Sequence, residues 1–133
     1  PAGVSAATFA FTTSNVNLQP EFTQIISKAL PAGNWVVIAT AEVTSPHHED
    51  DDFVNTNCQL RNGASLIGDA FDRRTVSNFI PFGGSTITAS LSMNGGAALP
   101  QGGTVSVWCR QLGEPGISTA QAQMMILQVG GFF

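Results

Sequence analysis

The sequence predicts an all-β sandwich or barrel, and two regularities support that prediction. Apolar residues recur at every second position in several segments, which is the period of a strand with one buried face. Turn-forming clusters of glycine, proline and asparagine separate those segments about every ten residues, a spacing typical of sandwiches and barrels. The chain has 133 residues. That length suits one domain, so we expect a single domain over residues 1–133, with residues 1–8 flexible or left from a linker.

The clearest strand is the segment NWVVIATAEVT at 34–44. The outer positions begin with Val36 and Ile38 and continue with threonine and glutamate, so the first half is expected to be covered on both sides and the second half to meet solvent. The inward face carries Trp35, Val37, Ala39, Ala41 and Val43.

Two further segments alternate in the same way. Residues 104–110 place valines and a cysteine inward and Trp108 outward, and residues 85–93 predict a half-exposed antiparallel strand. Residues 21–30 also fit helical spacing, and residues 118–128 are good helix formers throughout. We interpret both as strands because the neighbouring strands need partners.

A tight hairpin is predicted at Asn62-Gly63, which lies between two apolar runs. This dipeptide favours a two-residue turn with positive φ. The expected hairpin pairs residues 58–61 with residues 64–68.

Cys58 and Cys109 are the two cysteines of the chain, and each falls on the apolar face of an expected strand. That placement favours a disulfide across the sandwich over two buried free thiols. Such a bond would close a loop of about 50 residues and stabilise the fold by about 4 kcal/mol on the chain-entropy model.

Composition excludes some classes of partner. The net charge of −4 and pI near 4.8 argue against a nucleic-acid partner, because phosphate binding needs clustered Lys and Arg. No apolar run approaches the ~18 residues that span a bilayer, so we expect no membrane insertion. Charged residues are only 11% of the chain, which favours an extracellular, surface-exposed or oligomeric protein. No targeting signal is visible.

The segment HHEDDD gathers both histidines and four of the nine acids in consecutive positions. A carboxylate-rich loop suits Ca²⁺, and imidazole with carboxylate suits Zn²⁺. However, contiguous acids diverge on an extended chain, adjacent histidines face one ion poorly, and the loop has no glycine to turn it. We therefore expect no cofactor and a solvated loop, with a metal site as the alternative at His47, His48, Glu49, Asp50, Asp51 and Asp52.

Asp72, Arg73 and Arg74 form the other polar cluster. They suggest a recognition patch for an anionic sugar or partner, because arginine matches carboxylate geometry, or else local salt bridges on a strand edge. Trp108 is a second candidate ligand-binding residue because it falls on the outward set. We expect no catalytic residues: GASLIG is one residue too long for a nucleophile elbow, and neither cysteine has a histidine close by in sequence.

Several segments together resemble the jelly-roll heads of the tumour-necrosis-factor and complement globular-head superfamily, including heads of bacterial collagen-like surface proteins. LPAGNWVVIATAEV resembles that family's strand after a Pro-Gly turn, CQLRNGASLIGDAF resembles its central hairpin, and AQMMILQVGGFF resembles its terminal strand. The resemblance implies a two-sheet antiparallel jelly roll of about ten strands that packs as a homotrimer and is not an enzyme. The absence of tyrosine departs from the eukaryotic pattern and fits bacterial or fibre-like relatives better.

These observations lead to three functional hypotheses. The first is a non-enzymatic secreted or surface-displayed head that trimerises and binds a partner. This hypothesis agrees with nine phenylalanines and a terminal GGFF, since surplus apolar surface marks an interface. The second is a carbohydrate-binding lectin of the same fold that uses Trp108 as a stacking platform, and the third is an enzyme.

Overall fold

The computed structural model describes residues 4–47, 52–76, 85–113 and 118–130. In chain order the strands are β1 (Val4–Phe11), β2 (Val16–Asn17), β3 (Thr23–Leu30), β4 (Gly33–His47), β5 (Asp52–Asn62), β6 (Ser65–Val76), β7 (Ser85–Leu99), β8 (Gly103–Gly113) and β9 (Thr119–Val129). Among these residues there is no helix long and apolar enough to cross a membrane.

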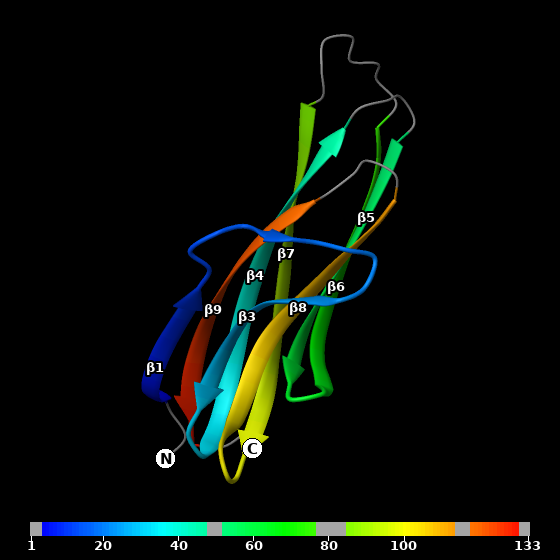
Figure 1. Ribbon diagram of the computed structural model, residues 1–133. Coiled ribbons are helices and arrows are strands. Elements are labelled where there is room, and N and C mark those ends of the chain that lie inside the picture. The colour runs from blue at the N-terminus through cyan, green and yellow to red at the C-terminus, as the bar shows by residue number, and fades with distance from the viewer. Residues whose placement is uncertain (1–3, 48–51, 77–84, 114–117, 131–133) are drawn as a thin grey trace.

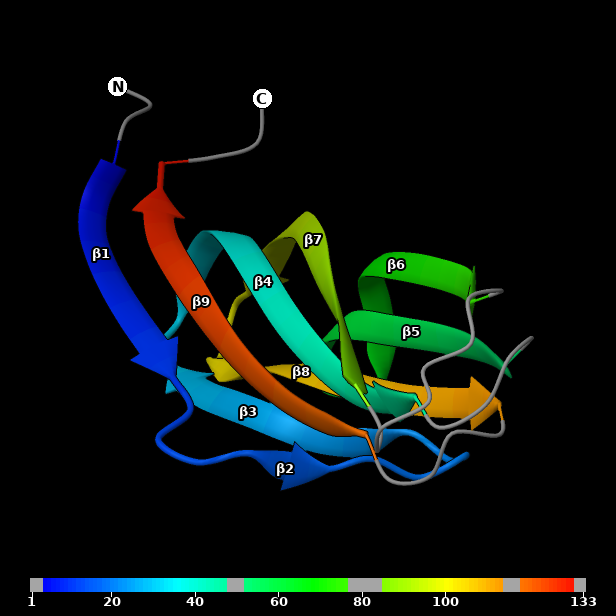
Figure 2. The same ribbon diagram turned by 90° about the horizontal axis from the view of Figure 1, so that it is seen from above.

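The strands make two antiparallel sheets packed face to face (Figures 1 and 2). One sheet has the order β1-β9-β4-β7, with β2 also paired to β9, and the other has the order β3-β8-β5-β6. From β2 to β5 and from β6 to β9 each successive strand lies in the opposite sheet, and this is the winding of a jelly roll. The predicted fold class is confirmed, with nine described strands where the resemblance implied about ten.

The core lies between the sheets, and the alternation of residues along each strand places it there. Every residue of the predicted inward set of 34–44 is buried. The inward residues of β9 lie beside them in the same sheet, and those of β8 face them from the other sheet. The largest fully buried side chains are Leu60, Met124, Ile126, Val37, Val43, Val105, Val107, Thr56, Cys58 and Cys109.

The two segments that could also have been helices are strands, as predicted. Residues 23–30 form β3, which pairs with β8, and residues 119–129 form β9, which pairs with β1, β2 and β4. Along β9 the residues Ala120, Ala122, Met124 and Ile126 are buried and their neighbours are not. Partners on both sides satisfy the backbone hydrogen bonds of β9, which outweighs the good helix propensity of its residues.

The predicted hairpin joins β5 to β6, but its turn lies one residue later than expected. Asn62 pairs with Ser65, so Gly63 and Ala64 form the turn. Gly63 has a φ of 58°, and its N–H donates to the carbonyl oxygen of Thr104 at 2.9 Å. Asn62 remains extended because it also belongs to the ladder with β8.

At one margin of the sandwich the two sheets approach closely through glycine. A Cβ on Gly68 of β6 would lie 2.9 Å from the carbonyl oxygen of Asn94 in β7. A Cβ on Gly95 would collide with the carbonyl oxygen of Ile67. The small residues let the backbones of β6 and β7 lie against each other, which closes the sandwich on that side.

Part of the segment expected to be flexible or a linker lies in a strand. Residues 4–8 belong to β1, which pairs with β9 along its length. The pairing with an inner strand orders a segment whose sequence carries no turn or cap signal of its own.

Candidate functional site

The outer face of the β1-β9-β4-β7 sheet carries most of the exposed large hydrophobic side chains among the described residues. Phe9 is 60% exposed, Phe11 is 69% exposed and Ile38 is 40% exposed. The remaining one, Leu66 at 53%, lies on the other sheet. Exposed apolar side chains that share one face mark an interaction surface more strongly than scattered ones do.

The register of the sheet makes these residues neighbours. Phe9 pairs with Met125, and Met125 pairs on its other side with Ile38, so these three form a row across three strands. In the same way Phe11, Gln123 and Thr40 form the next row. We call the six residues of these two rows the outer apolar face: Phe9, Phe11, Ile38, Thr40, Gln123 and Met125.

This face is hollowed between β1 and β4. A depression of about 280 Å³ is lined by all six residues of the outer apolar face together with parts of Ala10 and Met124. A second depression, of about 190 Å³, continues from Phe11 and Thr40 to Glu42 and Gln121. The surface therefore grades from apolar at the Phe9 row to polar at the Glu42 row.

The sequence predicts cover on both sides of the first half of β4, and the described chain supplies only one. Val36 is half-buried and Ile38 is 40% exposed on the outer side, where no second layer of the described chain lies over them. The prediction is wrong for a single chain. Pairs of apolar residues at these positions are typical of a strand that is buried on both faces.

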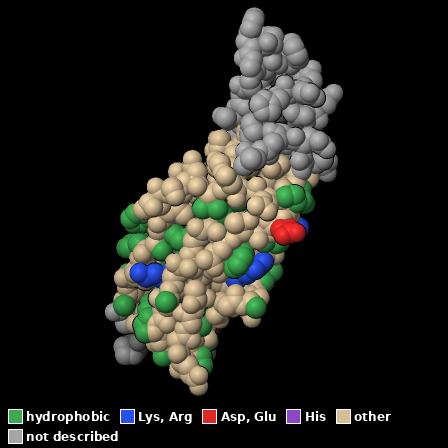
Figure 3. Space-filling view, viewed as in Figure 1, with side chains coloured by type: hydrophobic (Ala, Val, Ile, Leu, Met, Phe, Trp, Pro, Cys, Tyr) green, Lys and Arg blue, Asp and Glu red, His purple; other side chains and the backbone are tan. Residues whose placement is uncertain are grey.

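On the outer side of the β3-β8-β5-β6 sheet, two arginines and two aromatic rings form a compact group. The guanidinium carbon of Arg61 lies 4.5 Å from the centre of the Trp108 ring and 5.3 Å from that of Phe22. The guanidinium carbon of Arg110 lies 4.6 Å from the centre of the Phe22 ring. Figure 3 shows basic and hydrophobic side chains side by side on the face seen in Figure 1.

Hydrogen bonds hold Arg61 and Trp108 of this group in place. Arg61 donates from Nε and Nη2 to Oε1 of Gln59, at 2.9 and 2.7 Å. Trp108 donates from Nε1 to Oγ of Ser106 at 2.8 Å. A ligand that stacks on Trp108 must use the ring face that Arg61 leaves uncovered, or displace Arg61.

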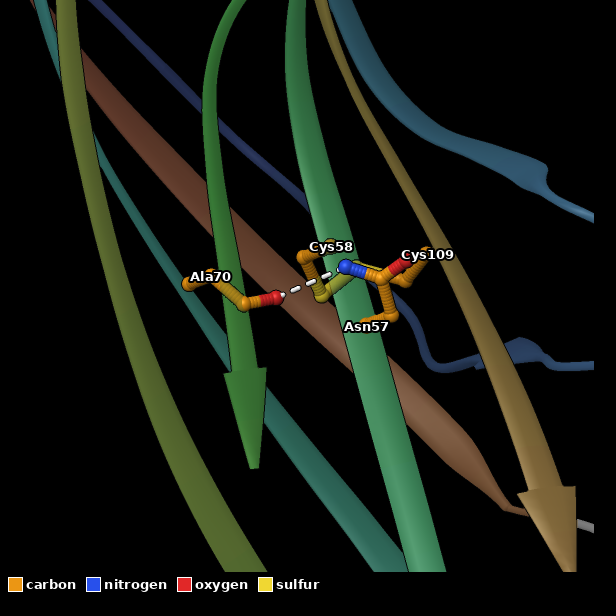
Figure 4. The surroundings of a disulfide bond; sticks show 4 residues. All are labelled: Asn57, Cys58, Ala70 and Cys109. Carbon is orange, nitrogen blue, oxygen red and sulfur yellow. Dashed lines mark hydrogen bonds between the residues drawn. A yellow bond between two sulfur atoms is a disulfide. The ribbon is translucent and has the colours of Figure 1, made fainter. Parts of the chain in front are cut away.

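Cys58 and Cys109 form a disulfide, as predicted, but not across the sandwich (Figure 4). They are directly opposed in the ladder between β5 and β8, with their Cα atoms 4.1 Å apart. Beside them, Asn57 donates from Nδ2 to the carbonyl oxygen of Ala70 at 3.0 Å. Both sulfurs point into the core, as the apolar pattern requires, yet they come from neighbouring strands of one sheet.

The other predicted site residues lie at or beyond the limits of the described chain. Asp72, Arg73 and Arg74 belong to β6, where their backbones pair with Thr56, Asn55 and Val54. His47 ends β4 and Asp52 begins β5, whereas His48, Glu49, Asp50 and Asp51 lie outside the described residues. Within the described part of the chain, no three His, Cys, Asp or Glu side chains are grouped to hold a metal ion.

Sequence reasoning missed Phe9, Phe11 and Arg61. A signal for the phenylalanines exists in the segment TFAF, where large rings alternate with small residues in an uncharged strand. Arg61 carries no comparable signal, because its contact with Phe22 depends on the pairing of β3, β8 and β5.

Comparison with known proteins gives a fold-level likeness only. No protein-family profile matches the sequence, and no curated protein matches it. Similar solved structures include one described as infectious bursal disease virus Gx strain, with 10% identity and a TM-score of 0.49. Another is the VP2 subviral particle of that virus, with 11% identity and a TM-score of 0.48. In both cases 98% of this chain is covered and it spans 34% of the other chain's length.

Proposed function

We propose that this protein is a non-enzymatic jelly-roll head that assembles with copies of itself through the outer apolar face. The observation that carries this proposal is the shared exposure of Phe9, Phe11 and Ile38 on one face of one sheet. Covering those side chains removes apolar surface from water, which is the main favourable contribution to protein association.

The composition of the surface agrees with such an interface. Aromatic residues and methionine at the centre, with polar residues around them, are the usual anatomy of a protein contact. Here Phe9, Met125 and Ile38 form the centre, and the Glu42 row forms a polar border. The uncovered outer side of Ile38 is the position at which a neighbouring copy completes the two-sided burial that the sequence of β4 indicates.

The resemblance to tumour-necrosis-factor and complement heads suggests the form of the assembly. On that analogy the head is a homotrimer, displayed outside the cell, that binds a protein partner through its surface loops. The disulfide supports an extracellular location, because such bonds persist in oxidising compartments. On the same analogy, we expect residues 1–133 to form one domain that binds no cofactor.

A lectin is the second candidate, and it is favoured by one observation. Trp108 is half-buried on an outer sheet face, opposite Gln59 in the ladder and against the guanidinium group of Arg61. An aromatic ring flanked by amide and guanidinium groups is a common way to bind a sugar.

One pair of variants tests the assembly proposal. Ile38→Asp places a carboxylate at the centre of the outer apolar face, and Leu66→Asp makes the same change at an exposed leucine of the other sheet. Light scattering should show a lower mass for Ile38→Asp and the wild-type mass for Leu66→Asp, with both variants retaining the wild-type circular dichroism spectrum. An unchanged mass for Ile38→Asp would contradict assembly through this face.

A glycan array tests the lectin candidate. Binding to the array by the wild-type protein that Trp108→Ala abolishes would favour the lectin.

A further inference from the structure

β1 lies at the margin of its sheet and has one edge without a partner among the described strands. It pairs with β9 on one side only, and Figure 2 shows it at the open side of the sandwich. An unpaired edge exposes a row of backbone N–H and C=O groups, which is a template for another extended strand.

The hydrogen-bond phase of β1 shows which groups point outward. In an antiparallel ladder, residues bonded to the partner strand alternate with residues whose N–H and C=O point away from it. Thr12 sets the phase, because its N–H donates to the carbonyl oxygen of Ala122 at 2.9 Å. The register is continuous from Ala6 to Phe11, so Ala7, Phe9 and Phe11 direct their backbone groups to the open edge.

Among the described strands, charges or a covering strand protect the other three sheet edges, and β1 has no such protection. The sequence of β6 contains Asp69, Asp72, Arg73 and Arg74, and that of β3 contains Lys28. β7 has no charge, but its backbone is covered by β6 through the close approach of Gly68 and Gly95. β1 has the sequence VSAATFAF, with neither a charged residue nor a proline. Charges, prolines and covering strands are the usual protections of an edge.

We propose that β1 pairs antiparallel with β1 of a second copy of this chain across a twofold axis. A register centred on Phe9 sets Phe9 opposite its own copy and Ala7 opposite Phe11. All three outward-pointing residues then exchange N–H and C=O hydrogen bonds with the partner. The two sheets become one continuous sheet with β1 at its centre.

A second copy suits this edge for two reasons. The edge presents N–H and C=O groups at the same residues, so it is complementary to itself, and no like charges meet when two copies pair. Pairing also brings the Phe9 and Phe11 side chains of both copies together on one face, because residues opposite each other across strands share a face. The outer apolar faces of the two copies thus become one surface.

This inference shares self-assembly with the proposed function but uses a different contact. Side chains project from the sheet face, whereas the edge hydrogen bonds lie in the plane of the sheet. One copy can therefore make both contacts. An assembly that forms through the outer apolar face therefore contains twice as many copies when the β1 edges also pair.

Residue-resolved amide hydrogen exchange of the wild-type protein tests the pairing directly. The amides of Thr8 and Ala10 bond to β9 and should be protected at every protein concentration. The amides of Ala7, Phe9 and Phe11 should exchange at least about tenfold more slowly at high than at low concentration. If these three amides exchange rapidly at a concentration where the protein is assembled, the edge-pairing proposal is wrong, whatever the face contact does.

Ala7→Pro provides the second test. Proline removes an outward-pointing N–H without removing a bond to β9, and it is tolerated on edge strands. Ala7→Thr is the matched control, since it retains the N–H and favours a strand. Ala7→Pro should halve the mass of the wild-type assembly, and Ala7→Thr should preserve it. A wild-type mass for a folded Ala7→Pro protein would overturn the proposal, while Ile38→Asp reports separately on the face contact.

Discussion

Cys58 and Cys109 stand directly opposite each other, so their disulfide links two strands that the ladder of β5 and β8 already holds together. The bond therefore adds little to the folded contact itself. It acts mainly on the unfolded chain, because it closes a loop across a sequence separation of 51, and a closed loop has fewer conformations to lose on folding.

Replacing both cysteines, Cys58→Ala with Cys109→Ala, should lower the free energy of unfolding by about 2–5 kcal/mol without changing the fold. Urea denaturation followed by tryptophan fluorescence measures the change. The wild-type protein with a reducing agent is the companion sample and should show a similar loss. A midpoint equal to that of the oxidised wild type would show that the disulfide does not constrain the unfolded chain.

At single residues, prediction from sequence succeeded where the local pattern decides the outcome. Alternation alone places Cys58, Cys109 and Val107 inward and Trp108 outward. Which strands are neighbours is a long-range property, so the sequence did not indicate that the two cysteines share a sheet. The same limit hid the contact of Arg61 with Phe22.

Among the elements, the margin where β6 meets β7 depends on glycine. The carbonyl oxygen of Ile67 occupies the space that a side chain on Gly95 would need. Backbone atoms on both strands are held by their ladders and cannot shift independently. This margin therefore has no room for even a methyl group.

Gly95→Ala should destabilise the protein by about 1–3 kcal/mol, the usual cost of overpacking a fixed contact. Gly63→Asn is the matched control. Apart from the glycine and its two chain neighbours, no heavy atom lies within 4 Å of a Cβ at Gly63, and asparagine tolerates its φ of 58°. Thermal or urea unfolding compares the two variants. Equal stabilities for Gly95→Ala and the wild type would show that β6 and β7 are free to move apart.

The strands were predictable because a period of two is a local signal, and segments 21–30 and 118–128 were assigned correctly once their neighbours were considered. Two element-level details were not. The hairpin turn moved by one residue because β8 holds Asn62 in an extended form. β1 was missed because its large side chains, Phe9 and Phe11, face outward, the reverse of the usual amphipathic strand.

For the whole molecule, the proposed self-assembly rests on one feature that the sequence and the structure share. The apolar pattern of β4 is typical of a strand that is buried on both faces, and the described chain leaves the outer side of Ile38 exposed to solvent. The site itself could be predicted only in kind, from the excess of phenylalanine and the scarcity of charge. Its location required the register that aligns Phe9 and Met125 with Ile38.

The most direct test of this account is the mass of the wild-type protein in solution, measured by light scattering over a series of micromolar concentrations. Self-assembly predicts a species whose mass is at least twice the 13.9 kDa of one chain and that persists on dilution through this range. A single species of 13.9 kDa at every concentration would contradict it, because the outer apolar face would then meet only water.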